Sequence, residues 1–253
     1  MKIDFSRYSS VKIGGVFEVE VLDSVREFAG VVVGGANNLL VSPTPPPLAI
    51  LGEEFDYTKF ENGILEIGGA TNAAKIFKFA RENHLGGFEI LGGIPGRLGG
   101  LVTMNAGLKG LSIGDNLLFV IASGGEIARE DCGLGYRASD IKGVIFGAKF
   151  EIKREFDEDL ARDLAQARRN QPKGASFGSC FANPENDSAG RLIEAAGLKG
   201  KRIGGCGFSE KHANFLINYG GGTFADATAL INLAKKAVFE RFGVKLREEV
   251  RII

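Results

Sequence analysis

The chain has 253 residues, enough to bury a substantial core and to form two or three subdomains. Its 31 Lys and Arg residues balance 31 Asp and Glu residues, so no overall basic field attracts nucleic acid and any anion site must be local. The chain has two histidines, three sparse cysteines, no signal-peptide pattern at its start and no apolar run of about 20 residues, so we expect a cytoplasmic protein without a bound metal or a membrane partner.

Strand and helix patterns alternate in the first part of the chain. Strands are expected over residues 16–21, 31–33, 64–67, 117–122 and 144–152. Asp23 or Ser24 can cap a short helix that runs through Phe28. Thr71 can cap a longer helix that ends near His84.

The last hundred residues change in character near Phe156, where we place a domain boundary. The segment 156–170 begins with acidic residues and continues with arginines, an order that suits the helix dipole. Helices are expected over 187–196 and 224–242, ended by Gly197 and Gly243, and a strand over 250–253.

Two stretches contain more glycine than a helix or a strand tolerates, namely residues 34–40 and 92–110. Successive backbone N–H groups in such a stretch can surround phosphate oxygens. Neither stretch has the spacing of a dinucleotide fingerprint or a P-loop. From the glycines alone, a plain connection explains 92–110 equally well, and a plain turn is favoured at 34–40.

Three further clusters are not explained by packing: residues 135–139, 178–184 and 246–251. Taken alone, each has an ordinary interpretation. A Tyr-Arg pair usually forms a surface stack or salt bridge, a serine beside glycine usually belongs to a turn, and paired glutamates usually face solvent.

Taken together and in order, these stretches resemble the UDP-N-acetylenolpyruvoylglucosamine reductase family, in a compact form without the tyrosine-bearing insertion. The resemblance covers nearly the whole chain. The matching motifs are Val33-Gly34-Gly35-Ala36-Asn37-Asn38-Leu39-Leu40, Gly93-Ile94-Pro95-Gly96, Met104-Asn105-Ala106-Gly107, Gly135-Tyr136-Arg137-x-Ser139, Gly178-Ser179-x-Phe181-x-Asn183-Pro184 and Glu249-Val250-Arg251.

The resemblance implies an α+β chain with an FAD-binding fold of the vanillyl-alcohol-oxidase/PCMH type. Its two small subdomains would span 1–52 and 53–155, followed by an α+β substrate-binding domain at 156–243 and a C-terminal strand at 244–253. The residues expected to bind FAD are Gly34, Gly35, Ala36, Asn37, Asn38, Leu39, Gly92, Gly93, Ile94, Pro95, Gly96, Gly99, Gly100, Asn105, Ala106 and Gly107.

The implied reaction has two half-reactions. NADPH reduces FAD, and hydride then passes from flavin N5 to C3 of the enolpyruvyl ether of UDP-N-acetylglucosamine-enolpyruvate, giving UDP-N-acetylmuramate for peptidoglycan synthesis. Ser179 would protonate C2, Arg137 would stabilise the carbanion-like charge, and Glu249 would lie at the carboxylate end. The residues expected to bind the small-molecule substrate are Tyr136, Asn183 and Lys211, with Arg168, Arg169 and Lys173 as further candidates for its diphosphate. We expect a monomer.

The chain departs from the family pattern at several positions. Ala36-Asn37 stands for Gly-Ser, Ala182 for Lys, and Arg97 for a small hydroxyl residue, so Arg97 can pair with a phosphate or point to solvent. Glu248 stands for Pro, which leaves it as an alternative catalytic residue, although Glu249 keeps the register of Glu-Val-Arg. The alternative functions are another FAD-dependent oxidase of the same fold, which uses oxygen to oxidise a small alcohol or sugar, and a binder without catalysis.

Overall fold

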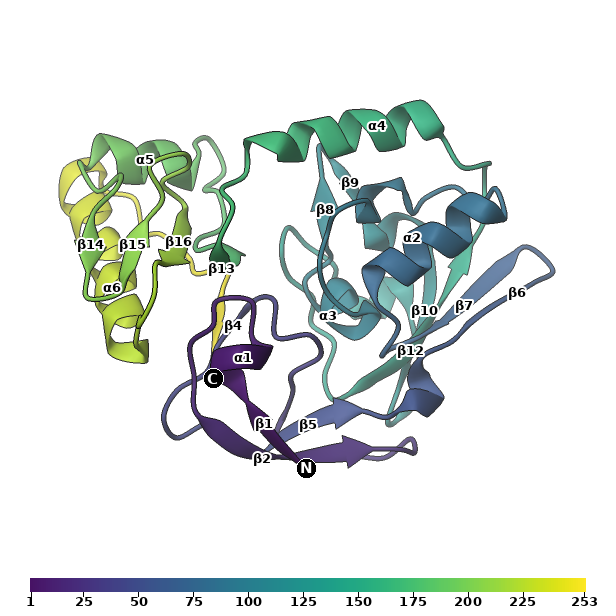
Figure 1. Ribbon diagram of the computed structural model, residues 1–253. Coiled ribbons are helices and arrows are strands. Elements are labelled where there is room, and N and C mark those ends of the chain that lie inside the picture. Colours follow the sequence, from purple (N-terminus) through teal and green to yellow (C-terminus); the bar gives the residue numbers. More distant parts are fainter. The chain divides into compact units, whose positions relative to one another are not determined.

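The computed structural model describes residues 1–253, apart from the side chain of Asn170. The chain forms two compact units, whose elements are labelled in Figure 1. Unit 1 contains Met1, residues 19–35 and residues 47–169, and unit 2 contains residues 2–18, 36–46 and 170–253. Each unit therefore combines segments that are far apart in the sequence. The division into three domains and a terminal strand stays a prediction.

Unit 1 contains an antiparallel sheet of five strands in the order β11-β10-β12-β7-β6, of which Figure 1 labels β10, β12, β7 and β6. The strands are β6 (Thr58–Glu61), β7 (Ile64–Gly68), β10 (Leu117–Ala122), β11 (Gly125–Ala128) and β12 (Ile145–Glu151). Ala148 in the central strand pairs with Val120 on one side and Ile67 on the other. This sheet confirms the strands predicted at 64–67, 117–122 and 144–152.

Three helices complete the main body of unit 1: α2 (Ala73–Glu82), α3 (Leu98–Thr103) and α4 (Glu158–Ala167). Ile76 of α2 and Leu98 of α3 are fully buried in one cluster with Leu65 of β7. Asn72 caps α2 by accepting a hydrogen bond from the Lys75 N–H at 2.8 Å. Thr71 is not the cap that the sequence predicted, because its hydroxyl instead donates to the Tyr57 carbonyl at 3.0 Å.

Unit 1 also contains a parallel arrangement around β5 (Leu48–Leu51), which pairs with residues 19–22 of β2 (Val16–Leu22) and with β3 (Val31–Val32), while residues 16–18 of β2 belong to unit 2. The predicted strands at 16–21 and 31–33 are therefore confirmed. The helix predicted from Asp23 or Ser24 to Phe28 is wrong, since these residues form bends and irregular chain. A segment this short gains too few hydrogen bonds to offset helix nucleation.

The remaining short elements of unit 1 are the hairpin β8 (Gly107–Leu108) and β9 (Leu111–Ser112) and four 3-10 turns. These turns cover Glu53–Phe55, Glu89–Leu91, Ile113–Asn116 and Arg129–Cys132, and a fifth covers Arg168–Asn170. The turn at Glu89–Leu91 leads directly into the second glycine-rich stretch, and therefore positions its first residues.

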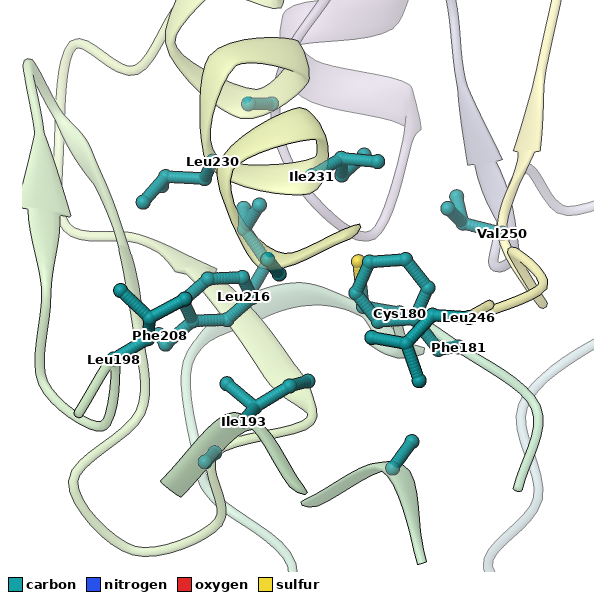
Figure 2. Close-up of a cluster of buried hydrophobic side chains, with 14 of the residues drawn as sticks. Cys180, Phe181, Ile193, Leu198, Phe208, Leu216, Leu230, Ile231, Leu246 and Val250 are labelled. Carbon is teal, nitrogen blue, oxygen red and sulfur yellow. The ribbon is translucent and has the colours of Figure 1, made fainter. Parts of the chain in front are cut away.

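Unit 2 is built on an antiparallel sheet in the order β13-β16-β15-β14. Its strands are β13 (Ala175–Ser179), β14 (Arg202–Ile203), β15 (Cys206–Phe208) and β16 (Phe215–Asn218). Helices α5 (Ala189–Ala195) and α6 (Phe224–Phe242) pack on a shared apolar cluster, in which Figure 2 shows Ile193, Phe208 and Leu230. Helix α6 has the bounds that the sequence predicts and ends at Gly243, whose φ is 70°.

Short N-terminal and C-terminal elements also belong to unit 2. They are β1 (Lys2–Asp4), α1 (Phe5–Tyr8), β4 (Leu39–Leu40) and β17 (Arg251–Ile252). Strands β4 and β17 run parallel, with Arg251 beside Leu39 and Ile252 beside Leu40. The end of the chain is thus paired with the stretch that follows the first glycine turn. No helix in the described part of the chain is long and apolar enough to cross a membrane.

Candidate functional site

The second glycine-rich stretch of unit 1 forms a loop over residues 92–97 with exposed backbone donors. Gly93 and Gly96 adopt φ values of 78° and 134°, which favour glycine. The Gly96 carbonyl accepts a hydrogen bond from the Ala73 N–H at 2.9 Å, which ties the loop to the start of α2. The N–H groups of Gly93, Gly96 and Arg97 donate to no other group of the described residues. The loop therefore offers unpaired donors of the kind that bind phosphate.

Glu89 anchors the start of this loop. Its side chain is 1% exposed and accepts four hydrogen bonds. Two come from the Arg154 guanidinium at 2.7 and 2.9 Å, and two come from the backbone N–H groups of Gly87 and Asp157 at 2.8 and 2.9 Å. Such a satisfied carboxylate is stable in the interior and holds its neighbours in place.

Arg137 lies on a turn that is fastened to the second half of the glycine stretch. The Ser139 hydroxyl donates to the Thr103 carbonyl at 3.0 Å, and the Asn105 amide donates to the Gly135 carbonyl at 3.1 Å. Arg137 itself adopts a φ of 55°, and its guanidinium lies 5.6 Å from the centre of the Tyr136 ring. The motifs at 104–107 and 135–139 are therefore one structural assembly within unit 1.

This assembly limits what the Asn105 side chain can contribute. Besides its bond to Gly135, it accepts a hydrogen bond from the Gly114 N–H at 3.1 Å. Both ends of the amide are thus used inside the protein. Any contact of Asn105 with a cofactor would have to rely mainly on its backbone.

Arg97 is half-buried, and its guanidinium donates to the Ala70 carbonyl at 3.1 Å. Its β-carbon lies 3.9 Å from the position that a β-carbon on Gly34 would take. Arg97 therefore does not simply extend into solvent. Its position beside Gly34 shows that the loop at 92–97 lies next to the part of the first glycine stretch that belongs to unit 1.

The turn at residues 34–38 tolerates its departure from the family pattern. Ala36 adopts a φ of 48°, which is unusual for a residue with a β-carbon, and is 1% exposed. The Asn37 amide donates to the Ser10 hydroxyl at 2.6 Å, so this side chain stabilises unit 2. Among the residues that the structure describes, the N–H groups of Gly35, Asn37 and Asn38 have no acceptor.

Ser179 ends strand β13 in unit 2, directly before a clamped segment. The Cys180 N–H donates to the Asn214 carbonyl at 2.7 Å. The buried Asn214 amide also accepts from the Phe181 N–H at 2.9 Å and donates to the Phe181 carbonyl at 2.7 Å. The sequence analysis missed Asn214, although an amide inside the apolar run from Ala213 to Ile217 was a signal for such a role.

Glu249 and Ser179 come from adjacent segments of unit 2. The Glu249 N–H donates to the Cys180 carbonyl at 2.9 Å, and the Asn38 amide donates to the Glu249 carbonyl at the same distance. Figure 2 shows Cys180 and Val250 in one apolar cluster. The structure thus brings together two of the three predicted catalytic residues, while Arg137 belongs to unit 1.

Glu248 has a different partner. Its carboxylate lies 2.7 Å from the Lys235 ammonium of α6. Burial raises the pKa of Glu248, but the hydrogen bond and the charge of Lys235, together with a hydrogen bond from the Glu248 backbone, leave that pKa below its ordinary value. A carboxylate held in an ion pair is less suited to contact a substrate, and the catalytic role of Glu249 stays a prediction.

The other predicted substrate residues lie on the surface of unit 2. The Asn183 side-chain oxygen accepts from the Ala189 N–H at 3.0 Å, at the start of α5, and the Lys211 ammonium donates to the Gln171 carbonyl at 3.2 Å. Ala182, which stands where the family has Lys, is 4% exposed. The substrate roles of Tyr136, Asn183 and Lys211 stay predictions.

Comparisons with known proteins agree over the full chain. Residues 170–253 match the family model described as UDP-N-acetylenolpyruvoylglucosamine reductase, C-terminal domain. The enzyme of that name from Campylobacter jejuni (strain RM1221) is 52% identical and aligned over 100% of both chains, and that from Helicobacter pylori (strain ATCC 700392 / 26695) is 46% identical over 99% and 98%.

A solved structure agrees as well. The UDP-N-acetylenolpyruvylglucosamine reductase (MurB) of Thermus caldophilus is 29% identical, with a TM-score of 0.86 over 100% of this chain and 98% of that one. The predicted α+β fold is thereby confirmed. The chain belongs to the UDP-N-acetylenolpyruvoylglucosamine reductase family of oxidoreductases.

Proposed function

We propose that this protein is an FAD-dependent enzyme that uses NADPH to reduce the enolpyruvyl ether of UDP-N-acetylglucosamine-enolpyruvate to UDP-N-acetylmuramate in the cytoplasm. Membership of the family supports the reaction class. The observation that carries the proposal is the hydrogen bond between Glu249 and Cys180, because it sets two residues of the expected chemistry on neighbouring segments of unit 2.

The residues present fit an FAD nucleotide. The unpaired N–H groups of Gly93, Gly96 and Arg97 suit diphosphate oxygens, as do those of Gly35 and Asn37. These backbone donors, with the glycines that allow close approach, would hold the cofactor. When bound, the flavin supplies hydride chemistry that no amino-acid side chain provides.

Each proposed catalytic side chain has a separate task. Ser179 delivers a proton to C2 of the substrate, a step that requires its hydroxyl to be held in place, and the clamp by Asn214 on the following residues serves this need. Arg137 holds the substrate carboxylate and stabilises the negative charge that develops there. Glu249 polarises the same end of the substrate. Cys180 does not compete as an acid, since its side chain is fully buried in the apolar cluster of unit 2.

The test separates the two half-reactions in Ser179→Ala by stopped-flow absorbance of the flavin. Reduction by NADPH should keep its wild-type rate, and reoxidation by the enolpyruvyl substrate should slow by about 100-fold or more, the usual loss of a general acid. Ser24→Ala, at an exposed bend where the hydroxyl contacts only the neighbouring Asp23, is the control and should affect neither step strongly.

Equal slowing of both half-reactions in Ser179→Ala would contradict the proton-donor assignment. Purified protein that takes up no FAD would contradict the proposed function as a whole. Steady oxygen consumption with a sugar substrate, without NADPH, would instead support the alternative oxidase.

A further inference from the structure

Arg168 lies against the loop at 92–97. It follows the last turn of α4, and its guanidinium donates to the Ile90 carbonyl at 3.4 Å. Its δ-carbon lies 3.7 Å from the position that a β-carbon on Gly93 would take. The stem of Arg168 therefore packs on the main chain that is expected to bind the cofactor.

The Arg168 side chain is half-buried and has no balancing charge beside it. Its Nε is inaccessible to solvent and has no hydrogen-bond partner among the described residues. Among the described residues, the charge that acts on Arg168 is that of Arg137 and not that of a carboxylate. Burial lowers the pKa of Arg168, and the positive charge of the nearby Arg137 lowers it further.

Such an arrangement costs free energy unless an anion occupies the space beside it. An unpaired donor and a charge in a poorly hydrated place are both unfavourable, and a second like charge nearby adds to the cost. A bound carboxylate would remove all three penalties, because it accepts hydrogen bonds and neutralises both guanidinium groups.

We propose that Arg168 binds the carboxylate of the enolpyruvyl substrate together with Arg137. This inference rests on the proposed function, since it concerns the carboxylate assigned to Arg137. A contact with the substrate diphosphate is less well supported. Arg168 shares unit 1 with Arg137, and the charge of Arg137 acts on it, which ties Arg168 to the carboxylate assigned to Arg137.

The experiment compares two ligands that differ in one carboxylate. UDP-N-acetylmuramate carries a lactyl carboxylate, and UDP-N-acetylglucosamine lacks it but keeps the same diphosphate and nucleoside. Dissociation constants of both are measured by calorimetry on the oxidised, FAD-loaded protein, without turnover. The ratio of the two constants reports the contribution of the carboxylate alone.

Wild-type protein should prefer UDP-N-acetylmuramate. Arg168→Gln should reduce this preference by about 10-fold or more, because one charge-assisted hydrogen bond is worth about 1.5–3 kcal/mol. Its affinity for UDP-N-acetylglucosamine should change by less than about 2-fold. Arg168→Lys keeps the charge and tests the site if the glutamine variant does not fold. Its preference for UDP-N-acetylmuramate over UDP-N-acetylglucosamine should fall by about 3-fold or more, since an ammonium cannot reproduce the guanidinium fork.

Arg169→Gln is the control, because Arg169 is the exposed neighbour of Arg168 on the same turn. Its preference should equal that of the wild type. An unchanged preference in Arg168→Gln or Arg168→Lys would overturn the inference, and so would an equal loss of affinity for both ligands, which would indicate a diphosphate contact. Wild-type protein that binds neither ligand would contradict the proposed function instead.

Discussion

Replacing Glu89 by glutamine should destabilise unit 1 strongly, although the change conserves size. Each carboxylate oxygen of Glu89 accepts one guanidinium N–H of Arg154 and one backbone N–H: Oε1 from Asp157 and Oε2 from Gly87. In Glu89→Gln, one oxygen becomes an NH₂ group. One guanidinium donor and one backbone donor then lose their acceptor, whichever way the amide is oriented.

The magnitude follows from the surroundings of these donors. Arg154 is 43% exposed, so water can hydrate its released N–H group in part. The backbone donor, from Gly87 or Asp157, makes a part-buried bond, and leaving such a group unsatisfied costs about 1–3 kcal/mol, to which the loss of a charged hydrogen bond is added. We expect a total loss of about 3 kcal/mol in the free energy of unfolding, or a fall of about 6–12 °C in Tm for a chain of this length.

Urea and thermal unfolding followed by far-ultraviolet circular dichroism measure this loss. The matched control is Glu240→Gln in the exposed pair with Lys236, where the charged atoms are 3.8 Å apart and the side chains are 62% and 72% exposed. That change should cost less than about 0.5 kcal/mol. If Glu89→Gln were no more destabilising than Glu240→Gln, the assignment of Glu89 as the anchor of the loop would be refuted.

Two further predictions concern a surface carboxylate and the thiols. The hydrogen bond from Arg191, assisted by the Ser188 N–H, lowers the pKa of Asp187 from 3.8 to about 2. The contribution of the Asp187 carboxylate to stability is therefore complete above its unfolded pKa and is lost as the pH falls through about 2. At neutral pH, Asp187→Asn should have a lower urea midpoint than the wild type, and the two midpoints should converge in acid. A difference that persisted in acid would contradict this account. Burial raises the pKa of the thiols of Cys132, Cys180 and Cys206, so a thiol reagent should modify none rapidly in the native protein and all three in denaturant. Rapid modification of the native protein would show that the thiols are accessible.

Local elements were predictable where a strong pattern and an end signal agree. Helix α6 has a long apolar periodicity, a Thr223 cap and a terminal Gly243, and its predicted bounds are those observed. Strand β10 was equally clear from its apolar run. The helix expected after Asp23 had only a cap residue, and a cap without enough following turns does not produce a helix.

In the candidate site, too, local motifs were predictable from the sequence and contacts between distant residues were not. The order of the motifs in the sequence was sufficient to predict the family, because each motif is local and its residues are contiguous. The ion pair of Glu248 with Lys235 required the structure, since Lys235 lies on another element. Asn214 was missed for the same reason, as its amide acts on Phe181, which is 33 residues away.

The sequence by itself determined the family, the glycine stretches and most of the regular elements, because these depend on neighbouring residues and on short periodic patterns. Only the tertiary structure decided that Asn38 and Cys180 hold the backbone of Glu249, and that Arg168 packs beside the loop at 92–97 with an inaccessible Nε. Such contacts join residues that are distant along the chain, and they form because packing of apolar neighbours brings their backbones together while every buried polar group seeks a partner.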